Sequence, residues 1–410
     1  MSNSARRTMT GPLPQRDVTP ADEARRNDHE YAALERAPNA APTGCVTINL
    51  DQLARNWKAL DDLVAPARCG AVVKANAYGL GADRVIPALV RAGCKVFFIA
   101  TPQEGHEARA LARHAEIYAL DGLLPGSAES FARDAIRPVL STLADVEAWA
   151  RLGARLGRPL ACGLHIDSGL NRLGLIARDA RRLAADRTLM PGIDVRLVMS
   201  HLACADNASD PKNQDQLLAF ETLSALFPGI PRSLAASDGL MLGKAYHFDL
   251  VRPGYALYGG QASLTNPAPV SPVITVTARI LAINDVAPGE SVGYAASWRA
   301  PRPSRIATIA AGYADGVPRS ASSANGAICG HVLIAGYKVA LVGRVSMDLI
   351  TADVTDLPPG CVAAGDDAVL FGSGLTIEDA GFAAGTIGYE ILTRLGTRFA
   401  RCYVEAGRGA

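Results

Sequence analysis

The sequence predicts an α/β protein, with an N-terminal (β/α)8 TIM-type barrel over residues 44–273 and a mainly antiparallel β domain over residues 274–410. The first observation is a series of eight short apolar runs that alternate with segments of mostly helical periodicity, because strands alternating with helices form a parallel sheet. The second is a change near residue 274 to β-rich runs separated by Gly, Pro and Asn, which is typical of an antiparallel module. A doubly wound open sheet has the same alternation and remains the alternative for the first domain.

Each predicted barrel strand is a short apolar run. The eight runs are AVV (71–73), VFFIA (96–100), IYAL (117–120), PVL (138–140), LACGLHI (160–166), VRLVMS (195–200), SLAA (233–236) and DLVRP (249–253). The connections between them include amphipathic patterns over 83–92, 142–152 and 214–227, which predict helices. A closed barrel of this type needs about 250 residues, and the segment from 44 to 273 has about 230.

The ordered part of the chain is predicted to begin at CVTINL (45–50), a β-rich run. A helix is expected from Asp51, because Leu53, Trp57 and Leu60 have helical spacing and Asp51 is a suitable N-cap residue. The preceding residues, 1–43, are polar, charged and punctuated by proline, and we predict a disordered tail.

The second domain contains five β-rich segments. They are VITVTARILAI (273–283), ESVGYAA (290–296), RIATIAAGY (305–313), GHVLIAGYKVALVG (330–343) and DAVLFG (367–372). One helix is predicted around 377–394.

Composition excludes several classes of protein. The 41 basic and 40 acidic side chains leave a net charge of +1, whereas a dedicated nucleic-acid binder needs a basic face. The chain has no run of about 18 uncharged apolar residues, so no membrane span is expected. The N-terminus lacks the apolar segment of a secretory signal. The eight cysteines form no C-x-x-C pair and no zinc-ligand spacing, so we expect reduced, mostly buried thiols, no metal and a cytoplasmic location.

Polar residues follow the carboxyl ends of the predicted barrel strands, where barrel enzymes place their active sites. Lys74 and Tyr78 follow the first strand, and the fifth ends at His165 and Asp167 before Arg172. The later strands lead into four further polar segments, namely Ser200–His201, Ser237–Gly239, Arg252 and Gly254–Tyr255. We expect these side chains to meet at one rim of the barrel.

Lys74 lies directly after Ala-Val-Val, at the edge of an apolar interior. Burial there would disfavour its ammonium form and lower its pKa, and a neutral lysine amine forms an imine with an aldehyde. The alternative is a lysine that caps a strand with its charge in solvent, which is the commoner role for a single lysine.

A phosphate site is expected in the loops after strands seven and eight, where barrels tend to bind phosphate. Ser237 with Gly239, and Gly254 with Tyr255, lie in those loops, although ordinary turns have similar composition. An imine-forming lysine and a phosphate cradle on one rim point to pyridoxal phosphate, whose ring acts as an electron sink.

Arg252 and His201 have two interpretations each. Arg252 could face the pyridine nitrogen of the cofactor and leave it unprotonated, which would weaken the electron sink; the alternative is an interdomain salt bridge. His201 could orient a neighbouring group, or it could be a buried structural histidine.

In the second domain, Tyr294, Tyr313, Arg344, Met347, Asp348 and Tyr389 lie in short motifs rich in glycine and polar residues. A free tyrosine has a pKa of about 10, so a tyrosine base needs neighbouring positive charge.

Several motifs, in order along the chain, resemble those of the bacterial alanine racemases, a fold type III family of pyridoxal-phosphate enzymes. The matching segments, which span residues from about 45 to 405, are AVVKANAYG, DSGLNRLG, SHLACAD, VRPGYALYG, SVGYAASW, AGYADG, GRVSMD and GTIGYE. The resemblance implies a head-to-tail homodimer that interconverts L-alanine and D-alanine for peptidoglycan synthesis.

The resemblance also implies a role for each matching residue. Lys74 would hold pyridoxal phosphate as an internal aldimine and act as one base, and Tyr294 of the other subunit would be the second base. Arg252 would contact the pyridine nitrogen, His201 would link Arg252 to Tyr294, and Arg172 would lie near the phenolic oxygen and the substrate carboxylate. The phosphate would be bound by Tyr78, Ser237, Gly254, Tyr255 and Tyr389.

Further implied roles concern the substrate path. Met347 of the other subunit would bind the substrate carboxylate through its backbone, and Asp348 would support the site from behind. The corridor that substrate follows would be lined by Tyr313, Asp206, Arg319, Arg344 and Ile387. Two bases on opposite faces of Cα allow racemisation without a base that swings.

The sequence departs from the family pattern at two positions. Some members have a carbamylated lysine, which is an anion, seven residues before the arginine that matches Arg172. This chain has His165 at that position. Arg172 would therefore need another anion as its partner, such as Asp167 or chloride. Many members have histidine where this chain has Leu80, a position expected to pack.

Three related functions are the alternatives. A broad-specificity amino-acid racemase of the same fold is one, a fold-related decarboxylase is another, and a single-barrel pyridoxal-phosphate-binding protein is the third. The arginine expected at the pyridine nitrogen disfavours the decarboxylase, and the β domain with Tyr294 disfavours the single barrel.

Overall fold

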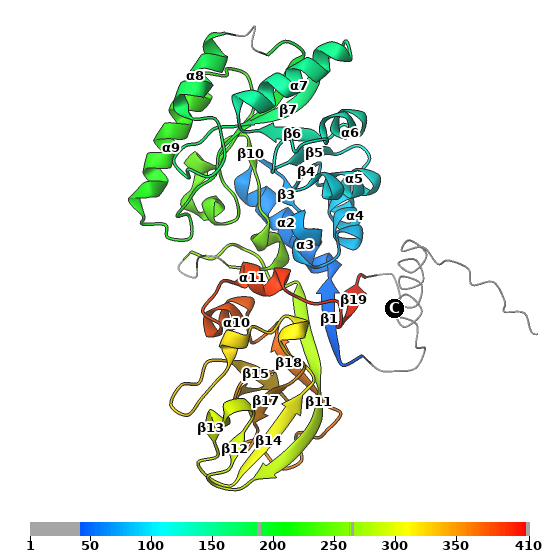
Figure 1. Ribbon diagram of the computed structural model, residues 1–410, viewed down its shortest axis with the longest axis vertical. Coiled ribbons are helices and arrows are strands. Elements are labelled where there is room, and N and C mark those ends of the chain that lie inside the picture. The colour runs from blue at the N-terminus through cyan, green and yellow to red at the C-terminus, as the bar shows by residue number, and fades with distance from the viewer. Residues whose placement is uncertain (1–41, 187–189, 262, 264–265, 407–410) are drawn as a thin grey trace, which may run out of the picture. The chain divides into compact units, whose positions relative to one another are not determined.

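A computed structural model describes residues 42–186, 190–261, 263 and 266–406 (Figure 1). The predicted tail, residues 1–43, lies outside the described residues except for its last two positions. No helix among the described residues is long and apolar enough to cross a membrane.

The first part of the fold is a parallel sheet of seven strands. In spatial order they are β3 (Ala71–Val72), β4 (Val96–Ile99), β5 (Glu116–Ala119), β6 (Arg137–Leu140), β7 (Leu160–His165), β8 (Ile193–Met199) and β9 (Arg232–Ser233). An eighth strand, β10 (Leu250–Val251), pairs in parallel with β2 (Arg68–Cys69), which directly precedes β3. Because Arg252 N donates to Ala235 O at 3.0 Å and Val72 N donates to Pro253 O at 2.8 Å, β10 links the two edges of the sheet. The (β/α)8 barrel prediction is confirmed.

Helices connect most of these strands. They are α2 (Leu50–Val64), α3 (Lys74–Tyr78), α4 (Ala82–Ala92), α5 (Pro102–Leu111), α6 (Ala128–Arg133), α7 (Leu143–Arg155), α8 (Ala177–Ala185) and α9 (Pro211–Ser224), with short 3-10 turns η2 (Asp238–Leu242), η3 (Lys244–Tyr246) and η4 (Tyr255–Tyr258). Helix α2 buries Leu53, Trp57 and Leu60, as its spacing predicts. The N-cap prediction was wrong, because the side chain of Asn49 accepts from Gln52 N at 2.9 Å and Asp51 lies in the first turn.

The second sheet is mainly antiparallel. Strand β11 (Ile274–Val286) pairs antiparallel with β14 (Ser304–Ile309) and β18 (Asp367–Phe371), and the remaining strands are β12 (Ser291–Val292), β13 (Trp298–Arg299), β15 (His331–Ile334), β16 (Tyr337–Ala340) and β17 (Ile350–Asp353). Short 3-10 turns η5 (Tyr294–Ala296), η6 (Tyr313–Asp315) and η7 (Arg319–Ala321) interrupt them. The single helix predicted around 377–394 is two helices, α10 (Ile377–Ala383) and α11 (Gly388–Thr393), because the chain turns at Gly385 with a φ of +65°.

The first strand of the chain belongs to this second sheet. Strand β1 (Gly44–Asn49) pairs antiparallel with β11 and parallel with β19 (Ala400–Val404), the last strand, and Figure 1 shows β1 beside β19. The chain therefore starts in the β domain, enters the barrel at α2 and returns to the β domain at β11.

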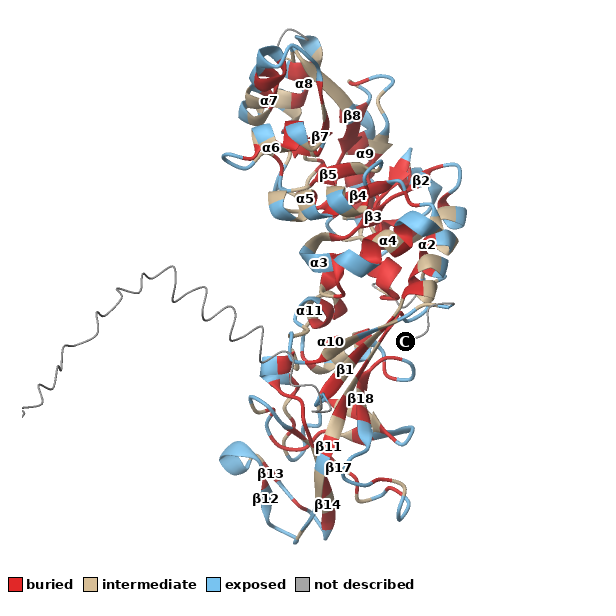
Figure 2. Cartoon of the chain, turned by 90° about the vertical axis from the view of Figure 1, so that its right-hand side faces the viewer, coloured by how far each residue is buried: buried red, intermediate tan, exposed pale blue. Residues whose placement is uncertain are grey.

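The core is rich in fully buried strand residues, which Figure 2 shows in red along the barrel strands. The cysteines differ from the expectation of mostly buried thiols. Cys69, Cys94 and Cys162 are buried, whereas the other five are at least partly exposed.

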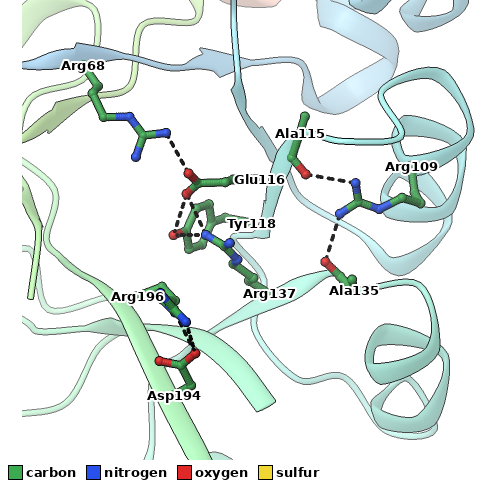
Figure 3. Close-up of polar contacts among 9 residues, drawn as sticks. All are labelled: Arg68, Arg109, Ala115, Glu116, Tyr118, Ala135, Arg137, Asp194 and Arg196. Carbon is green, nitrogen blue, oxygen red and sulfur yellow. Dashed lines mark hydrogen bonds and ion pairs between the residues drawn. The ribbon is translucent and has the colours of Figure 1, made fainter. Parts of the chain in front are cut away.

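Charged residues gather at the amino ends of barrel strands such as β5 and β6, which begin at Glu116 and Arg137 (Figure 3). Glu116 accepts from Arg68 at 2.7 Å and from Arg137 at 2.6 Å, and Arg137 also donates to Tyr118 Oη at 2.8 Å. Arg109 donates to the carbonyls of Ala115 and Ala135, both at 2.9 Å. Residues at the amino-terminal face of a barrel contribute to its stability, whereas active sites form at the carboxyl-terminal face. We therefore interpret this cluster as structural.

Candidate active site

Lys74 begins an unusual turn at the end of the first barrel strand. The four residues after it, Ala75 to Tyr78, all have positive φ values between 52° and 57° and so form a left-handed turn. Non-glycine residues avoid this conformation, which costs roughly 1–2 kcal/mol per residue. Strain of this kind persists only where the surroundings impose it, and it is concentrated at functional sites.

Three groups hold the left-handed turn. Glu104 of α5 accepts from Ala75 N at 2.7 Å through Oε1, and its Oε2 accepts from Ala100 N at 2.8 Å. Asn76 Oδ1 accepts from Ala82 N at 2.7 Å. Strand β19 holds the following residues through Arg401, which donates to Gly79 O at 3.1 Å, and through Tyr403, which donates to Leu80 O at 2.8 Å. The side chain of Lys74, which is partly buried, makes no hydrogen bond or ion pair with any described residue.

Arg252 is buried at the end of β10 and is held by uncharged acceptors. It donates to Ser233 Oγ at 2.5 Å, to Ser200 O at 2.7 Å and to Leu234 O at 3.1 Å. Burial lowers the pKa of Arg252 to about 9, so the guanidinium stays charged at pH 7. Within the described part of the chain Arg252 has no carboxylate partner, which contradicts the salt-bridge alternative.

The two histidines near Arg252 are neutral at pH 7. Burial, then the charge of Arg252, lowers the pKa of His201 to about 3 and that of His165 to about 4. The Nδ1 atom of His201 lies 3.5 Å from Arg252 Nη2. Because arginine can only donate, Nδ1 is the acceptor and the proton of His201 is on Nε2. The charge of Lys74 makes a smaller contribution to the lowered pKa of His201.

Arg172 lies exposed on the loop after β7. The suggested ion pair with Asp167 does not form, because Asp167 Oδ1 accepts instead from the backbone N–H groups of Gly169, Leu170 and Asn171 at 2.9–3.1 Å. Asp167 therefore shapes the loop that presents Arg172 and leaves the guanidinium free.

The residues predicted to bind phosphate lie together. Ser237 Oγ accepts from Gly254 N at 3.0 Å and from Ala256 N at 3.2 Å, and a Cβ atom on Gly254 would lie 2.3 Å from Tyr78 Oη. The rings of Tyr255 and Tyr389 stack at 4.0 Å, and Tyr78 lies 6.3 Å from Tyr389. Burial raises the pKa of all three tyrosines, so each keeps its hydroxyl proton as a donor.

Two carboxylates in this region were given no role from the sequence, although Asp238 belongs to the predicted rim segment Ser237–Gly239. Tyr389 donates to Asp238 at 3.2 Å, and Tyr255 donates to Glu378 at 2.7 Å. Burial raises the pKa of Asp238 to about 6, despite the hydrogen bond from Tyr389. Asp238 follows the predicted Ser237 directly, so its position was available from the sequence, whereas Glu378 is 123 residues from Tyr255 and had no local signal.

A cavity of about 600 Å³ joins several of these residues. Its lining includes Arg172, His201, Ser237, Asp238, Tyr255 and Tyr389, together with Asp206 and Ile387 from the predicted corridor. The structure thus brings together most of the predicted residues that lie on the barrel or next to it.

A second group of predicted residues lies on loops of the β domain. The side chains of Tyr294, Met347 and Tyr313 are exposed, with relative accessibilities of 71%, 53% and 39%, and Arg319 and Arg344 are exposed too. Tyr313 N donates to Ser346 O at 3.0 Å, and Asp348 forms an ion pair with Arg398 at 2.6 Å. Figures 1 and 2 both show β12 and β13, which flank Tyr294, at the end of the β domain distant from α3.

The fold and the barrel residues define a class: a (β/α)8 barrel protein with a β domain and a lysine directly after the first barrel strand. Comparisons with known proteins identify the family. Residues 48–262 match the alanine racemase N-terminal domain and residues 273–403 match the alanine racemase C-terminal domain. The chain belongs to the alanine racemase family.

Individual relatives cover most of the chain. The alanine racemase of Methylobacterium sp. (strain 4-46) is 46% identical over 360 residues, which is 88% of this chain and 97% of the relative, and that of Rhizobium meliloti is 44% identical over 366 residues, 88% and 96%. Among solved structures, an alanine racemase from Bartonella henselae with covalently bound pyridoxal phosphate has a TM-score of 0.84 at 37% identity, covering 89% of this chain and all of that one. The biosynthetic alanine racemase from Pseudomonas aeruginosa has a TM-score of 0.82 at 35% identity, with coverage of 89% and 100%.

Proposed function

We propose that this protein interconverts L-alanine and D-alanine with pyridoxal phosphate as its cofactor, and that it supplies D-alanine for peptidoglycan in the cytoplasm. The observation that carries the proposal is the group on the barrel rim, where a free lysine, a charged buried arginine and three tyrosine hydroxyls gather. The relatives named alanine racemase match this chain over nearly their whole length, which supports the same reaction.

The residues of the rim suit pyridoxal phosphate. Gly254 allows the close approach of the Tyr78 hydroxyl, because a Cβ atom there would lie only 2.3 Å from Tyr78 Oη. The hydroxyls of Tyr255 and Tyr389, which donate to Glu378 and Asp238 in this structure, would turn from these carboxylates to donate to phosphate oxygens. Lys74 would carry the cofactor, and Tyr78, Ser237, Gly254, Tyr255 and Tyr389 would hold its phosphate. When bound, pyridoxal phosphate supplies an electron sink that makes the Cα proton of an amino acid acidic.

Arg252 would face the pyridine nitrogen. Its guanidinium donates to Ser233 Oγ, Ser200 O and Leu234 O, and it keeps its protons at neutral pH because its pKa of about 9 lies above that pH. A ring nitrogen that accepts a hydrogen bond from Arg252 therefore stays unprotonated. This arrangement would weaken the electron sink and favour return of the proton to Cα over loss of carboxylate.

Two bases would move the Cα proton. Lys74 Nζ would take or give the proton on one face, and Tyr294 Oη of a second subunit would act on the other face. Tyr294 is 71% exposed, and no hydrogen bond connects it to Lys74, Arg252 or His201 within the described part of one chain. His201, which accepts from Arg252 at Nδ1, would direct its Nε2–H toward Tyr294.

The substrate carboxylate would lie between Arg172 and the backbone of Met347 from the second subunit. Arg172 lines the cavity, and its charge is unpaired among the described residues, so it is available to an anion. The side chain of Met347 is 53% exposed. Its loop accepts two hydrogen bonds, from Tyr313 N to Ser346 O and from Ala314 N to Met347 O. Asp206, Ile387, Tyr313, Arg319 and Arg344 would line the corridor, and Asp348 would fix the loop through Arg398.

The reaction is tested with purified protein and L-alanine in D2O. Loss of optical activity by circular dichroism, with deuterium entering Cα by proton NMR and no keto acid or amine formed, is the expected result. A visible cofactor band without Cα exchange would refute alanine as the substrate. Serine, lysine and arginine assayed in parallel distinguish a broad-specificity racemase.

The shared site is tested by mixing two inactive variants. Lys74→Ala and Tyr294→Phe are each expected to be nearly inactive. In a mixed dimer one site carries both changes and the other carries neither, so a statistical mixture should recover about a quarter of wild-type activity. If both bases came from one chain, no intact site would form and the mixture would stay inactive. Mixing Lys74→Ala with Lys74→Arg is the matched control without recovery.

A further inference from the structure

The first and last strands of the described chain place two cysteines together. Cys45 on β1 and Cys402 on β19 lie on parallel neighbouring strands, where Cys45 is opposite Ala400 and Thr47 is opposite Cys402. The Cys45 thiol donates to the Cys402 sulfur, with the two sulfur atoms 2.8 Å apart. This separation is less than an ångström longer than an S–S bond of about 2.05 Å.

Solvent reaches this pair, unlike the other close pair of cysteines. Cys402 is exposed and Cys45 is partly exposed, because both face outward from the second sheet. Cys69 and Cys94 also lie near enough to influence each other, but both are buried. Cys204, Cys329 and Cys361 are partly exposed, and none of them has a sulfur partner among the described residues.

We propose that Cys45 and Cys402 are a modification site that forms a reversible intramolecular disulfide in the presence of a hydroperoxide. The thiolate of Cys402 attacks one peroxide oxygen, which gives a sulfenic acid and one water. The sulfur of Cys45 then attacks the Cys402 sulfur, forms the S–S bond and expels the hydroxyl as a second water. Two thiols and one hydrogen peroxide therefore become one disulfide and two waters, and a dithiol reverses the change.

The disulfide would close a very long loop, because the two cysteines are 357 positions apart in the sequence. Closing a long loop restrains the unfolded chain and so stabilises the folded state. Strand β19 also carries Arg401 and Tyr403, which bond Gly79 O and Leu80 O next to the Lys74 turn. Since the sulfurs are already close, we expect the oxidised protein to keep its turnover within about twofold and to resist heat better.

The test is peptide mapping of the full-length protein after treatment with hydrogen peroxide and blocking of free thiols with N-ethylmaleimide. Trypsin cleaves after Arg36, Arg55, Arg401 and Arg408, so the expected product joins residues 37–55 to residues 402–408. It should be lighter than the two separate peptides by two hydrogens and should disappear with dithiothreitol. The thermal midpoint should rise by about 2–5 °C on oxidation and return on reduction.

Matched variants separate this site from general oxidation. Cys361→Ser, which changes another partly exposed cysteine, should behave as wild type, whereas Cys45→Ser and Cys402→Ala should lose the linked peptide and the shift in midpoint. Accumulation of Cys402 sulfinic acid without the linked peptide would overturn the proposal. A band of twice the chain mass on a non-reducing gel, with the link between chains, would also overturn it.

Discussion

The carboxylate of Glu104 accepts a hydrogen bond from the backbone N–H of Ala75, the residue after Lys74, at 2.7 Å. Its other oxygen accepts from Ala100 N at 2.8 Å, at the end of the neighbouring barrel strand. Glu104 therefore ties the first residue of the left-handed turn to the rim of the barrel, and we interpret it as a positioning residue for Lys74.

Replacing Glu104 should reduce turnover, because the turn that positions Lys74 would lose its hydrogen bond at Ala75 N. Glu104→Gln keeps one acceptor oxygen and loses the charge, so we expect kcat to fall about tenfold, and Glu104→Ala should fall further and lose roughly 2 kcal/mol of stability. The measurement is kcat and KM, together with the visible spectrum of the bound cofactor. Glu107→Gln, an exposed residue of the same helix, is the control. An unchanged kcat with an altered thermal midpoint would show that Glu104 is only structural.

Asp238 should make cofactor binding depend on pH. Its folded pKa is raised to about 6 by burial, so the carboxyl is neutral below that pH and charged above it. A charged Asp238 in the pocket predicted to bind phosphate would repel a dianion, and affinity should fall as pH rises from 5 to 8. Asp238→Asn should bind tighter at pH 8 and about equally at pH 5.

The probe for this prediction is pyridoxamine phosphate, which forms no imine with Lys74 and so reports phosphate binding alone. Its dissociation constant is measured for the wild type and for Asp238→Asn from pH 5 to pH 8. Because the ligand titrates identically in both experiments, the ratio of the two constants at each pH reports Asp238 alone. Parallel curves for the wild type and Asp238→Asn would contradict the role given to Asp238.

The barrel was predictable because strands of a parallel sheet are buried on both faces and appear as continuous apolar runs. All eight runs contain strands or strand residues of the barrel. The position of β1 was not predictable, because CVTINL has the same β-rich composition whether it joins the barrel or the second sheet. Its partners, β11 and β19, lie more than 200 residues away.

The sequence predicted which residues lie on the barrel rim, but it did not predict the contacts that hold them there. Lys74, Arg252 and the phosphate loops follow from the barrel rule, and their family roles follow from resembling motifs. The left-handed turn had no local signal, since Ala75, Ala77 and Tyr78 are residues that avoid positive φ. In the sequence, Glu104 forms an ordinary capping-box pattern with Thr101. This local pattern explains the residue fully, so its hydrogen bond from Ala75 N could not be predicted.

His165 allows a test of the carbamylated-lysine position. The imidazole is buried and neutral, with a pKa lowered to about 4 by burial and by Arg252, so it supplies no negative charge near Arg172. In His165→Lys, an amine among these arginines should be partly neutral and able to form a carbamate. We expect turnover to fall without bicarbonate and to recover at least in part with it. The turnover of His165→Gln should not change with bicarbonate. If bicarbonate also left the turnover of His165→Lys unchanged, residue 165 would not correspond to the carbamylated-lysine position.

The N-terminal strand should be essential, whereas the residues before it should be dispensable. The family match begins at residue 48 and the described fold begins at residue 42, so a chain that starts at Pro42 should keep its turnover and its thermal midpoint. A chain that starts at Leu50 lacks β1, which buries Val46 and Ile48 completely, at roughly 1.5–3 kcal/mol each. It would also expose the edges of β11 and β19 that β1 covers, and such edges promote aggregation. We therefore expect the shorter chain to be insoluble or to melt far below the longer one. Equal circular dichroism midpoints for the two chains would show that β1 contributes little to the sheet.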